Sequence, residues 1–189
     1  KYFDEHVTRS VPMYKEIHDL VTVFSDYFIN EESIIYDLGC STGSLLNKIQ
    51  NRHKEKKSIK LVGFDISESM IKHAKENNKS RQINFYNKNI IDLDFELASI
   101  FISTYTMQFI NAKSRQKTID SIYQSLDWGG AFFMFEKVRG SDARFQDMMT
   151  SAYTVFKQEQ GFSSDEIIDK STQDLESRGV YESKPPSFG

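Results

Sequence analysis

A short loop of small residues between two apolar stretches is the part of this sequence best suited to hold a nucleotide-like ligand. Residues 33–38 form an isoleucine-rich run, and Gly39-Cys40-Ser41-Thr42-Gly43 leads from it into an amphipathic stretch at residues 44–52. Glycine allows a ligand to approach the backbone closely, and amide N–H groups at a helix start face such a ligand. The pattern predicts a strand–loop–helix cradle in which a β-carbon at Gly39 or Gly43 would occupy ligand space.

A carboxylate further along the chain indicates that the ligand contains a nucleoside. Asp65 follows a second apolar run at residues 59–64, where an acidic residue accepts ribose hydroxyls in dinucleotide-binding folds. The loop lacks both the G-x-G-x-x-G pattern and the lysine of a P-loop. An acidic residue near the end of the first run, a glycine loop without a phosphate reader and Asp65 together resemble the class I S-adenosylmethionine (SAM) enzymes. SAM, a nucleoside with a cationic sulfonium and an amino-acid tail, suits such a site better than a dinucleotide.

The elements that must hold these residues alternate along the chain. Apolar spacing predicts a helix over residues 12–28, and Ser67 is suited to cap a helix directly after Asp65. We expect strands at 34–38, 59–64, 83–86, 98–104 and 131–136, and helices at 44–52, 67–75, 112–125, 143–158 and 163–169. A turn at residues 128–130 is expected to precede the last strand. This alternation predicts an α/β fold with a doubly wound, mostly parallel sheet and additional helical lid elements.

Length and composition narrow the class of protein. At 189 residues the chain suffices for one core, so we expect a single SAM-binding domain over residues 1–189, with an N-terminal helical segment at 1–30 and a helical lid or dimer segment at 141–175. A formal net charge of −3 gives no basic stripe, so we expect a small-molecule substrate and no direct contact with nucleic acid. One cysteine excludes an intrachain disulfide, and the four histidines show no metal-site spacing. Without a signal peptide or an apolar run of membrane-spanning length, we expect a cytoplasmic protein that holds no metal.

Six short segments match one family closely and in order along the chain. They are Arg9-Ser10-Val11-Pro12-Met13-Tyr14, Tyr36-Asp37-Leu38-Gly39-Cys40-Ser41, Tyr105-Thr106-Met107-Gln108-Phe109-Ile110, Ile122-Tyr123-Gln124-Ser125-Leu126, Gly129-Gly130-Ala131 and Phe135-Glu136-Lys137. Together they resemble the carboxy-S-adenosylmethionine synthase family, and R-S-V-P-x-Y with T-M-Q-F-I is far more specific than the glycine loop. The resemblance implies a homodimer that binds SAM, takes a carboxyl group from prephenate and supplies the carboxymethyl donor for wobble-uridine modification of tRNA.

The resemblance also implies which residues bind SAM. Tyr14 would contact its amino-acid end, Gly39 and Ser41 would line its backbone cradle, and Asp65 would bind the ribose. The full set of expected cofactor-binding residues is Tyr14, Gly39, Cys40, Ser41, Asp65, Ile66, Asn89, Ile90 and Thr104.

Two of these positions depart from the family pattern. Asn89 stands where many members have an adenine-binding aspartate, and either side chain can accept a hydrogen bond from the exocyclic amine. Thr104 stands where the family usually has asparagine, which puts a contact near the sulfonium and carboxylate in doubt. The catalytic residues stay unknown, and the candidates are Arg9, Tyr14 and Thr104.

Three side chains in these segments allow two interpretations each. Arg9 is either a carboxylate binder or an ordinary surface charge. Cys40 suggests a nucleophile, but we expect a small buried residue because the sequence places no histidine partner beside it. Glu136 either faces a ligand at the end of the last strand or forms an ion pair there.

Two places in the chain lack segments that members of the family have. The resemblance skips residues between Val7 and Thr8 and again between Lys170 and Ser171, where the family carries an arginine that binds the product carboxylate in the other subunit. Either these deletions are real, or residues are missing from the sequence as given; we expect the second, and therefore a break in space at both places. Real deletions would favour two alternatives, a SAM-dependent methyltransferase acting on a small molecule or a non-catalytic SAM-binding subunit.

Overall fold

The computed structural model describes residues 2–78 and 80–169. Within this part, the chain divides into two compact units, one of residues 14–138 and one of residues 2–13 with 139–169. The predicted single domain therefore comprises two units, and the candidate site lies in the larger one.

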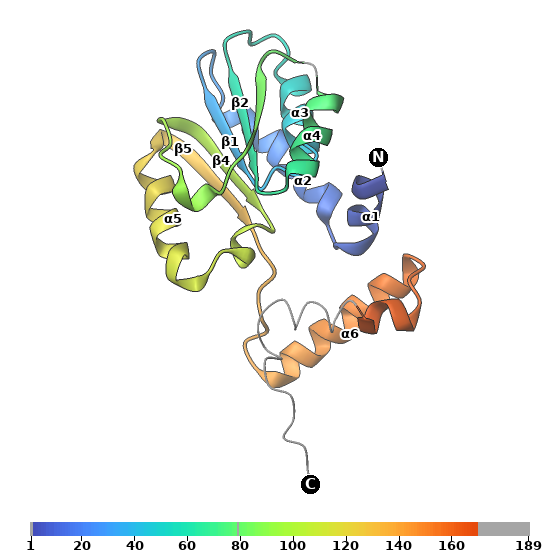
Figure 1. Ribbon diagram of the computed structural model, residues 1–189. Helices are drawn as coiled ribbons and strands as arrows, with labels where there is room; N and C mark the ends of the chain where they lie inside the picture. Colours follow the sequence, from blue (N-terminus) through green and yellow to red (C-terminus); the bar gives the residue numbers. More distant parts are fainter. Residues whose placement is uncertain (1, 79, 170–189) are drawn as a thin grey trace. The chain divides into compact units, whose positions relative to one another are not determined.

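The larger unit is built on a parallel sheet of five strands in the order β3-β2-β1-β4-β5 (Figure 1). The strands are β1 (Ile34–Leu38), β2 (Lys60–Asp65), β3 (Ile83–Asn87), β4 (Ala98–Thr104) and β5 (Leu126–Phe135). The strand order reverses direction between β1 and β4, which makes that point the usual ligand crevice of an open α/β sheet. The predicted doubly wound parallel sheet is confirmed.

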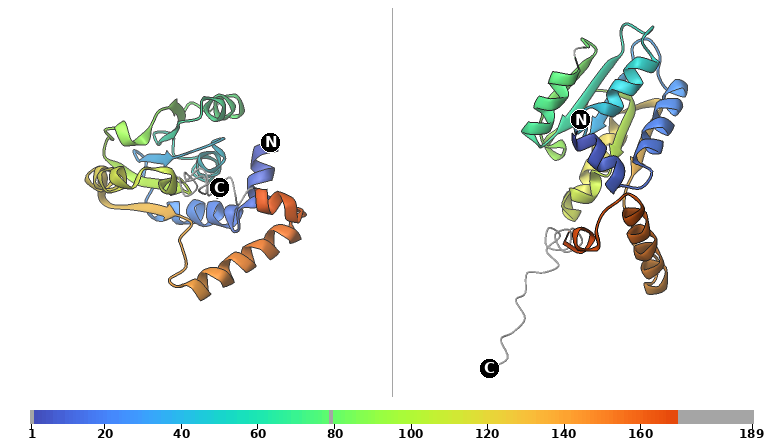
Figure 2. Two further views of the ribbon diagram at one scale, coloured as in Figure 1. Left: turned by 60° about the horizontal axis from the view of Figure 1, so that its bottom comes forward. Right: turned by 90° about the vertical axis from the view of Figure 1, so that its right-hand side faces the viewer.

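Helices cover both faces of this sheet, as the end-on view in Figure 2 shows. They are α2 (Tyr14–Phe24), α3 (Ser44–Arg52) and α4 (Glu68–Asn77) on one face and α5 (Ala112–Gln124) on the other. Successive strand residues point to opposite faces, so Ile35 packs under the first group of helices while Tyr36 packs in the cluster that includes Ile122 of α5. Burial on both faces explains why the strands read as continuous apolar runs.

Most predicted boundaries are confirmed, but β5 begins earlier than expected. Residues 128–130 form no turn before the strand; they lie inside it, where the pairing with β4 shifts from Ala98–Leu126 to Ile100–Ala131. The extra residues form a bulge, and Gly129 supplies its positive φ of 77°. The predicted cap of α4 is confirmed, because Ser67 Oγ accepts a hydrogen bond from Met70 N–H.

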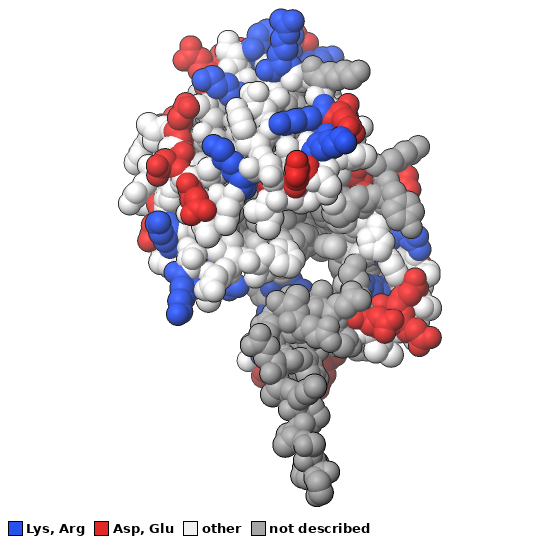
Figure 3. All heavy atoms as spheres, in the orientation of Figure 1, with Lys and Arg blue, Asp and Glu red and all other residues white. Residues whose placement is uncertain are grey.

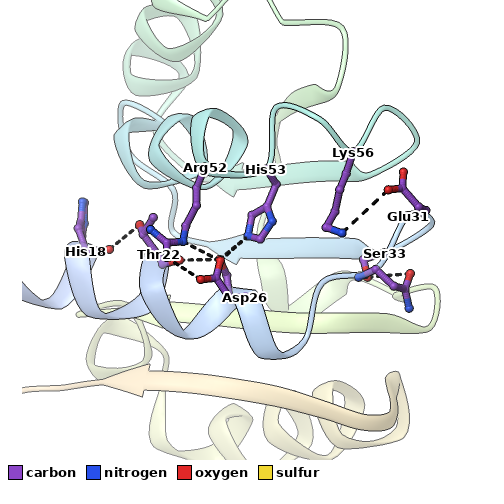
Figure 4. A network of polar contacts seen from close by, with 10 residues as sticks. His18, Thr22, Asp26, Glu31, Ser33, Arg52, His53 and Lys56 are labelled. Atoms are coloured by element: carbon purple, nitrogen blue, oxygen red, sulfur yellow. Dashed lines mark hydrogen bonds and ion pairs between the residues drawn. The ribbon is translucent and has the colours of Figure 1, made fainter.

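A polar network joins the end of α2 to the end of α3 (Figure 4). Ser25 Oγ donates to Thr22 O and lies 2.8 Å from His53 Nε2, so the imidazole N–H donates to Ser25. Asp26 Oδ1 lies 3.6 Å from the same nitrogen, and Asp26 also pairs with Arg52. Ser25 and Asp26 therefore both face Nε2 of His53. In a catalytic triad, by contrast, the serine and the aspartate contact different ring nitrogens of the histidine. The network holds two helices together at the end of the sheet away from the glycine loop.

The smaller unit contains α1 (Tyr2–Ser10), α6 (Ala143–Glu159) and a helical stretch at residues 164–169. Tyr153 Oη of α6 donates a hydrogen bond to Ser10 O (3.1 Å). Helix α1 runs unbroken through Val7 and Thr8, and Val11 N–H donates to Val7 O (2.8 Å). That residues are missing from the chain between Val7 and Thr8 stays a prediction. The second predicted break, after residue 170, lies outside the described residues.

The surface of the molecule carries charges of both signs. On the face drawn in Figure 3, basic and acidic side chains are interspersed over the upper part of the molecule. Within residues 2–78 and 80–169, none of the helices combines the length and apolar character that crossing a membrane requires. The absence of a direct nucleic-acid contact stays a prediction.

Candidate functional site

The carboxyl ends of the strands bring three of the predicted site residues to one edge of the sheet. Asp65 ends β2 and Thr104 ends β4. Gly39 directly follows β1, the strand between them, and its N–H donates to Phe64 O of β2 (2.8 Å). Residues that are distant in sequence thus meet at the strand-order reversal, where parallel α/β sheets bind ligands.

The glycine loop has the strained backbone that such a cradle needs. Gly39 and Gly43 have φ values of 85° and 74°, and Ser41 has 49°, a region that glycine enters without steric penalty. The sequence predicts that these glycines leave room for a ligand, and the structure adds a second reason. A β-carbon on Gly39 would lie 2.8 Å from Thr106 Cγ2, and one on Gly43 would lie 2.6 Å from a ring carbon of Phe85. Close packing inside the protein therefore requires both glycines, whatever ligand the loop holds.

Asp65 fastens the loop to the next helix. Its Oδ2 accepts from Ser41 N–H and its Oδ1 accepts from Ser67 N–H, each at 2.9 Å. Each carboxylate oxygen can accept more than one hydrogen bond, so both remain able to accept a ribose hydroxyl. Asp65 thus shapes the cradle in addition to its predicted ligand contact, which stays a prediction.

Asp37 is a site residue that the sequence reasoning left without a role. Its side chain is 3% exposed, and no hydrogen bond joins its carboxylate to any other described residue. Burial, and then the negative charge of Asp65, raise the pKa of Asp37 to about 7. A buried acid without a partner is costly unless a cation compensates it. In the sequence, the position of Asp37 two residues before Gly39 was the signal that could have pointed to it. Only the structure shows that its buried carboxylate has no hydrogen bond from another described residue.

Further unpartnered polar atoms lie at the end of β4. Among the described residues, the buried oxygens without a hydrogen bond include Ser103 Oγ, Thr104 Oγ1 and Gln108 Oε1. Buried polar groups nearly always have a partner. Ser103 and Thr104 are consecutive strand residues and point to opposite faces of the sheet. The unpartnered oxygen of Thr104, the last residue of β4, is the one that a polar ligand at this edge could complete.

The remaining predicted cofactor residues differ in what they present. Ile66 follows Asp65 and is 75% exposed, so it offers an apolar surface beside the expected ribose. Asn89 is exposed, and its Oδ1 accepts from Ile91 N–H (3.3 Å) at the start of η2 (Ile90–Asp92). Ile90 instead is buried in the core under α5, so its side chain does not line a surface.

Cys40 and Tyr14 also have clear structural surroundings. Cys40 is buried, and burial with the nearby Asp37 and Asp65 raises the pKa of its thiol above the ordinary value. A thiol that stays protonated is no nucleophile, which confirms the expected small buried residue. Tyr14 begins α2 and packs its ring 4.3 Å from that of His18.

Arg9 lies in the smaller unit and has partners there. Its guanidinium donates to Gln160 O through Nε and Nη2, at the end of α6, and lies 5.3 Å from the centre of the Phe162 ring. A cation at a helix C-terminus is stabilising. These contacts make Arg9 a cap for α6, and its role as a carboxylate binder stays a prediction.

Comparison with known proteins agrees with this geometry. A family model described as a methyltransferase domain matches residues 35–130. Carboxy-S-adenosyl-L-methionine synthase from Staphylococcus epidermidis is 40% identical over 169 residues, which cover 89% of this chain and 73% of the relative. The chain belongs to the carboxy-S-adenosyl-L-methionine synthase family. The enzyme of the same name from Campylobacter lari is 38% identical over 170 residues, with 89% and 71% covered.

A solved structure supports the fold assignment. The YcgJ protein from Bacillus subtilis matches with a TM-score of 0.58 at 12% sequence identity, over 90% of this chain and 86% of that one. Membership of the carboxy-SAM synthase family and of the class I methyltransferase fold makes the chain a SAM-dependent transferase. The described residues fit SAM. The carboxylate of Asp37 is buried without a positively charged neighbour among them, and the sulfonium of SAM would supply that positive charge.

Proposed function

We propose that this chain transfers a carboxyl group from prephenate to SAM, and that the product serves wobble-uridine modification of tRNA. The proposal is supported by its similarity to carboxy-SAM synthases over 89% of the chain. The main observation in support of the site is Asp37, a buried carboxylate that accepts no hydrogen bond from another described residue and lies next to a glycine loop with positive φ angles.

The residues of the site would divide the work by charge and position. Asp37 would attract the cationic part of SAM into a poorly hydrated site, where electrostatic attraction is strong. Asp65 and Ile66 would hold the nucleoside, and Asn89 would accept from the adenine amine. SAM itself supplies the activated methyl group that receives the carboxyl carbon.

Thr104 favours a second candidate function. The family usually has asparagine at this position, and Thr104 Oγ1 is a buried oxygen without a partner. A shorter side chain leaves more space near the sulfonium, which suits an ordinary methyltransferase with a small-molecule acceptor. A non-catalytic SAM-binding subunit is the third possibility. The family arginine that would argue against both alternatives belongs to the segment that the resemblance skips between Lys170 and Ser171.

We also propose a homodimer in which α6 contacts a second copy. The apolar residues of α6 recur at helical spacing and are about half exposed: Phe145, Met148, Met149 and Val155. A contiguous apolar face of this kind on a helix is typical of an interaction surface. The family resemblance names the second copy as the occupant.

A direct assay tests the activity. The purified protein is incubated with SAM and prephenate, and the products are analysed by mass spectrometry for SAM carrying an added carboxyl group. We expect this product only when both substrates are present, and its loss in Asp37→Asn. Binding of SAM without this product, even at high enzyme concentration, would contradict carboxyl transfer and leave methyl transfer or a binding subunit.

A further inference from the structure

A single carboxylate from β5 organises the loop that follows β4. Glu136 follows β5 directly, and its Oε1 accepts from Met107 N–H (2.7 Å) while its Oε2 accepts from Gln108 N–H (3.2 Å). The half-buried Glu136 thus accepts from two consecutive backbone donors, a role that differs from both of those expected from the sequence.

These donors begin the short helix η3 (Met107–Phe109), which has no cap of its own. The residue at its N-cap position, Thr106, makes no side-chain capping hydrogen bond. Unsatisfied N–H groups at a helix start need an acceptor, and a carboxylate is the strongest one available. Glu136, from a distant part of the chain, therefore provides the hydrogen-bond acceptor that Thr106 does not provide.

The loop also has a backbone conformation that needs support. Tyr105 has a φ of 57°, a region that costs a non-glycine residue of this kind about 1 kcal/mol or more. Tyr105 N–H donates to Phe135 O (2.7 Å), directly before Glu136. The end of β5 therefore holds the loop from both sides of the strained residue.

The loop in turn forms one wall of the glycine cradle. Thr106 packs so closely on Gly39 that a β-carbon there would overlap it. The loop follows Thr104 directly and carries Gln108, and the buried side-chain oxygens of both residues have no hydrogen-bond partner within the described part of the chain. A shift of the loop would move the side chain of Gln108 and would loosen the packing of Thr106 against Gly39.

We propose that Glu136 is a positioning residue for SAM, which acts by clamping the backbone of residues 107 and 108 and so fixing the neighbouring Thr106, which forms the wall of the cradle. Glu136 need not touch the ligand. Its effect passes through the backbone amides to Thr106 and from there to Gly39.

Replacement by glutamine tests the clamp. In Glu136→Gln one acceptor becomes an NH2 donor that opposes a backbone N–H. We expect SAM affinity by calorimetry to fall by about tenfold, a loss of about 1.4 kcal/mol, and the amides of Met107 and Gln108 to exchange faster with deuterium. The control is Asp142→Ala, which removes another carboxylate cap, at Phe145 N–H of α6. This control should lower thermal stability without changing SAM affinity.

The activity readout rests on the proposed function, so affinity and turnover are measured separately. If the wild type binds SAM but forms no carboxylated product, carboxyl transfer is wrong while the test of Glu136 still stands. Unchanged SAM affinity in a folded Glu136→Gln variant would overturn the positioning role. If that variant does not fold, exchange in the wild type decides, because rapid exchange of the Met107 and Gln108 amides at neutral pH would overturn the clamp.

Discussion

Replacing Asp37 by asparagine should weaken SAM binding and stabilise the protein at the same time. The pKa of Asp37 is about 7, so about one tenth of the carboxylate is charged at pH 6 and about nine tenths at pH 8. If the cation of SAM pairs with the charged form, binding releases a proton. SAM affinity should therefore rise by about tenfold from pH 6 to pH 8 and level off above the pKa. Asp37→Asn should remove this rise.

The same pKa sets the expected change in stability. A carboxyl with an ordinary pKa of 3.8 that is raised to about 7 on folding keeps its proton more readily when folded. Stability is therefore lost as the pH rises from about 4 through about 7, by up to about 4 kcal/mol. Asparagine cannot ionise, so the variant should unfold at a higher temperature than the wild type at pH 8. The gain will be smaller than this bound, because the buried amide also lacks partners.

Calorimetric titration with SAM at several pH values, in buffers of different ionisation enthalpy, measures both affinity and proton release. The titration of the amino group of SAM is common to both proteins and cancels in their ratio. An affinity of the wild type that does not change between pH 6 and pH 8, or an equal slope in Asp37→Asn, would refute the reasoning. Thermal unfolding at pH 8 provides the second measurement, and a lower melting temperature in the variant would contradict the unpaired carboxylate.

Four further outcomes are expected. Asp65→Asn should reduce SAM affinity by about tenfold or more and lower the melting temperature, because the amide loses one acceptor at the loop; calorimetry showing wild-type affinity would exclude it as the ribose ligand. Gly39→Ala should destabilise the fold as well as abolish SAM binding, since its β-carbon meets the loop after β4; unfolding at the wild-type temperature would show that ligand space alone explains the glycine. Burial lowers the pKa of His53 below its ordinary 6.5, so its share of stability is complete above pH 6.5 and is lost at lower pH; the melting temperature of His53→Gln should fall less between pH 7 and pH 5 than that of the wild type. Met148→Glu should convert a dimer to a monomer in light scattering, whereas Asp147→Ala, on the opposite side of α6, should not; a dimer in both variants would place the contact elsewhere.

Local sequence patterns determined most of the fold. The apolar run before Gly39 and the amphipathic run after Gly43 have the predicted bounds, because alternating burial and helical spacing are properties of adjacent residues. Asp65 and Thr104 reached the predicted edge, since parallel strands bring their carboxyl ends together. The start of β5 was missed because Gly129 and its neighbour are typical of a turn, and only pairing with β4 draws them into a bulge.

Tertiary structure alone decided how the site works. The burial of Asp37 and its lack of a hydrogen bond from other described residues depend on β1 lying between β2 and β4, and no local pattern records them. Gly39 serves packing against Thr106, a residue far along the chain. Glu136 caps a helix that begins some thirty residues earlier, at Met107 N–H, because the neighbouring strands β4 and β5 place the two ends together. Sequence identified candidate residues for a SAM site, whereas charge, burial and backbone support arose from contacts between distant segments.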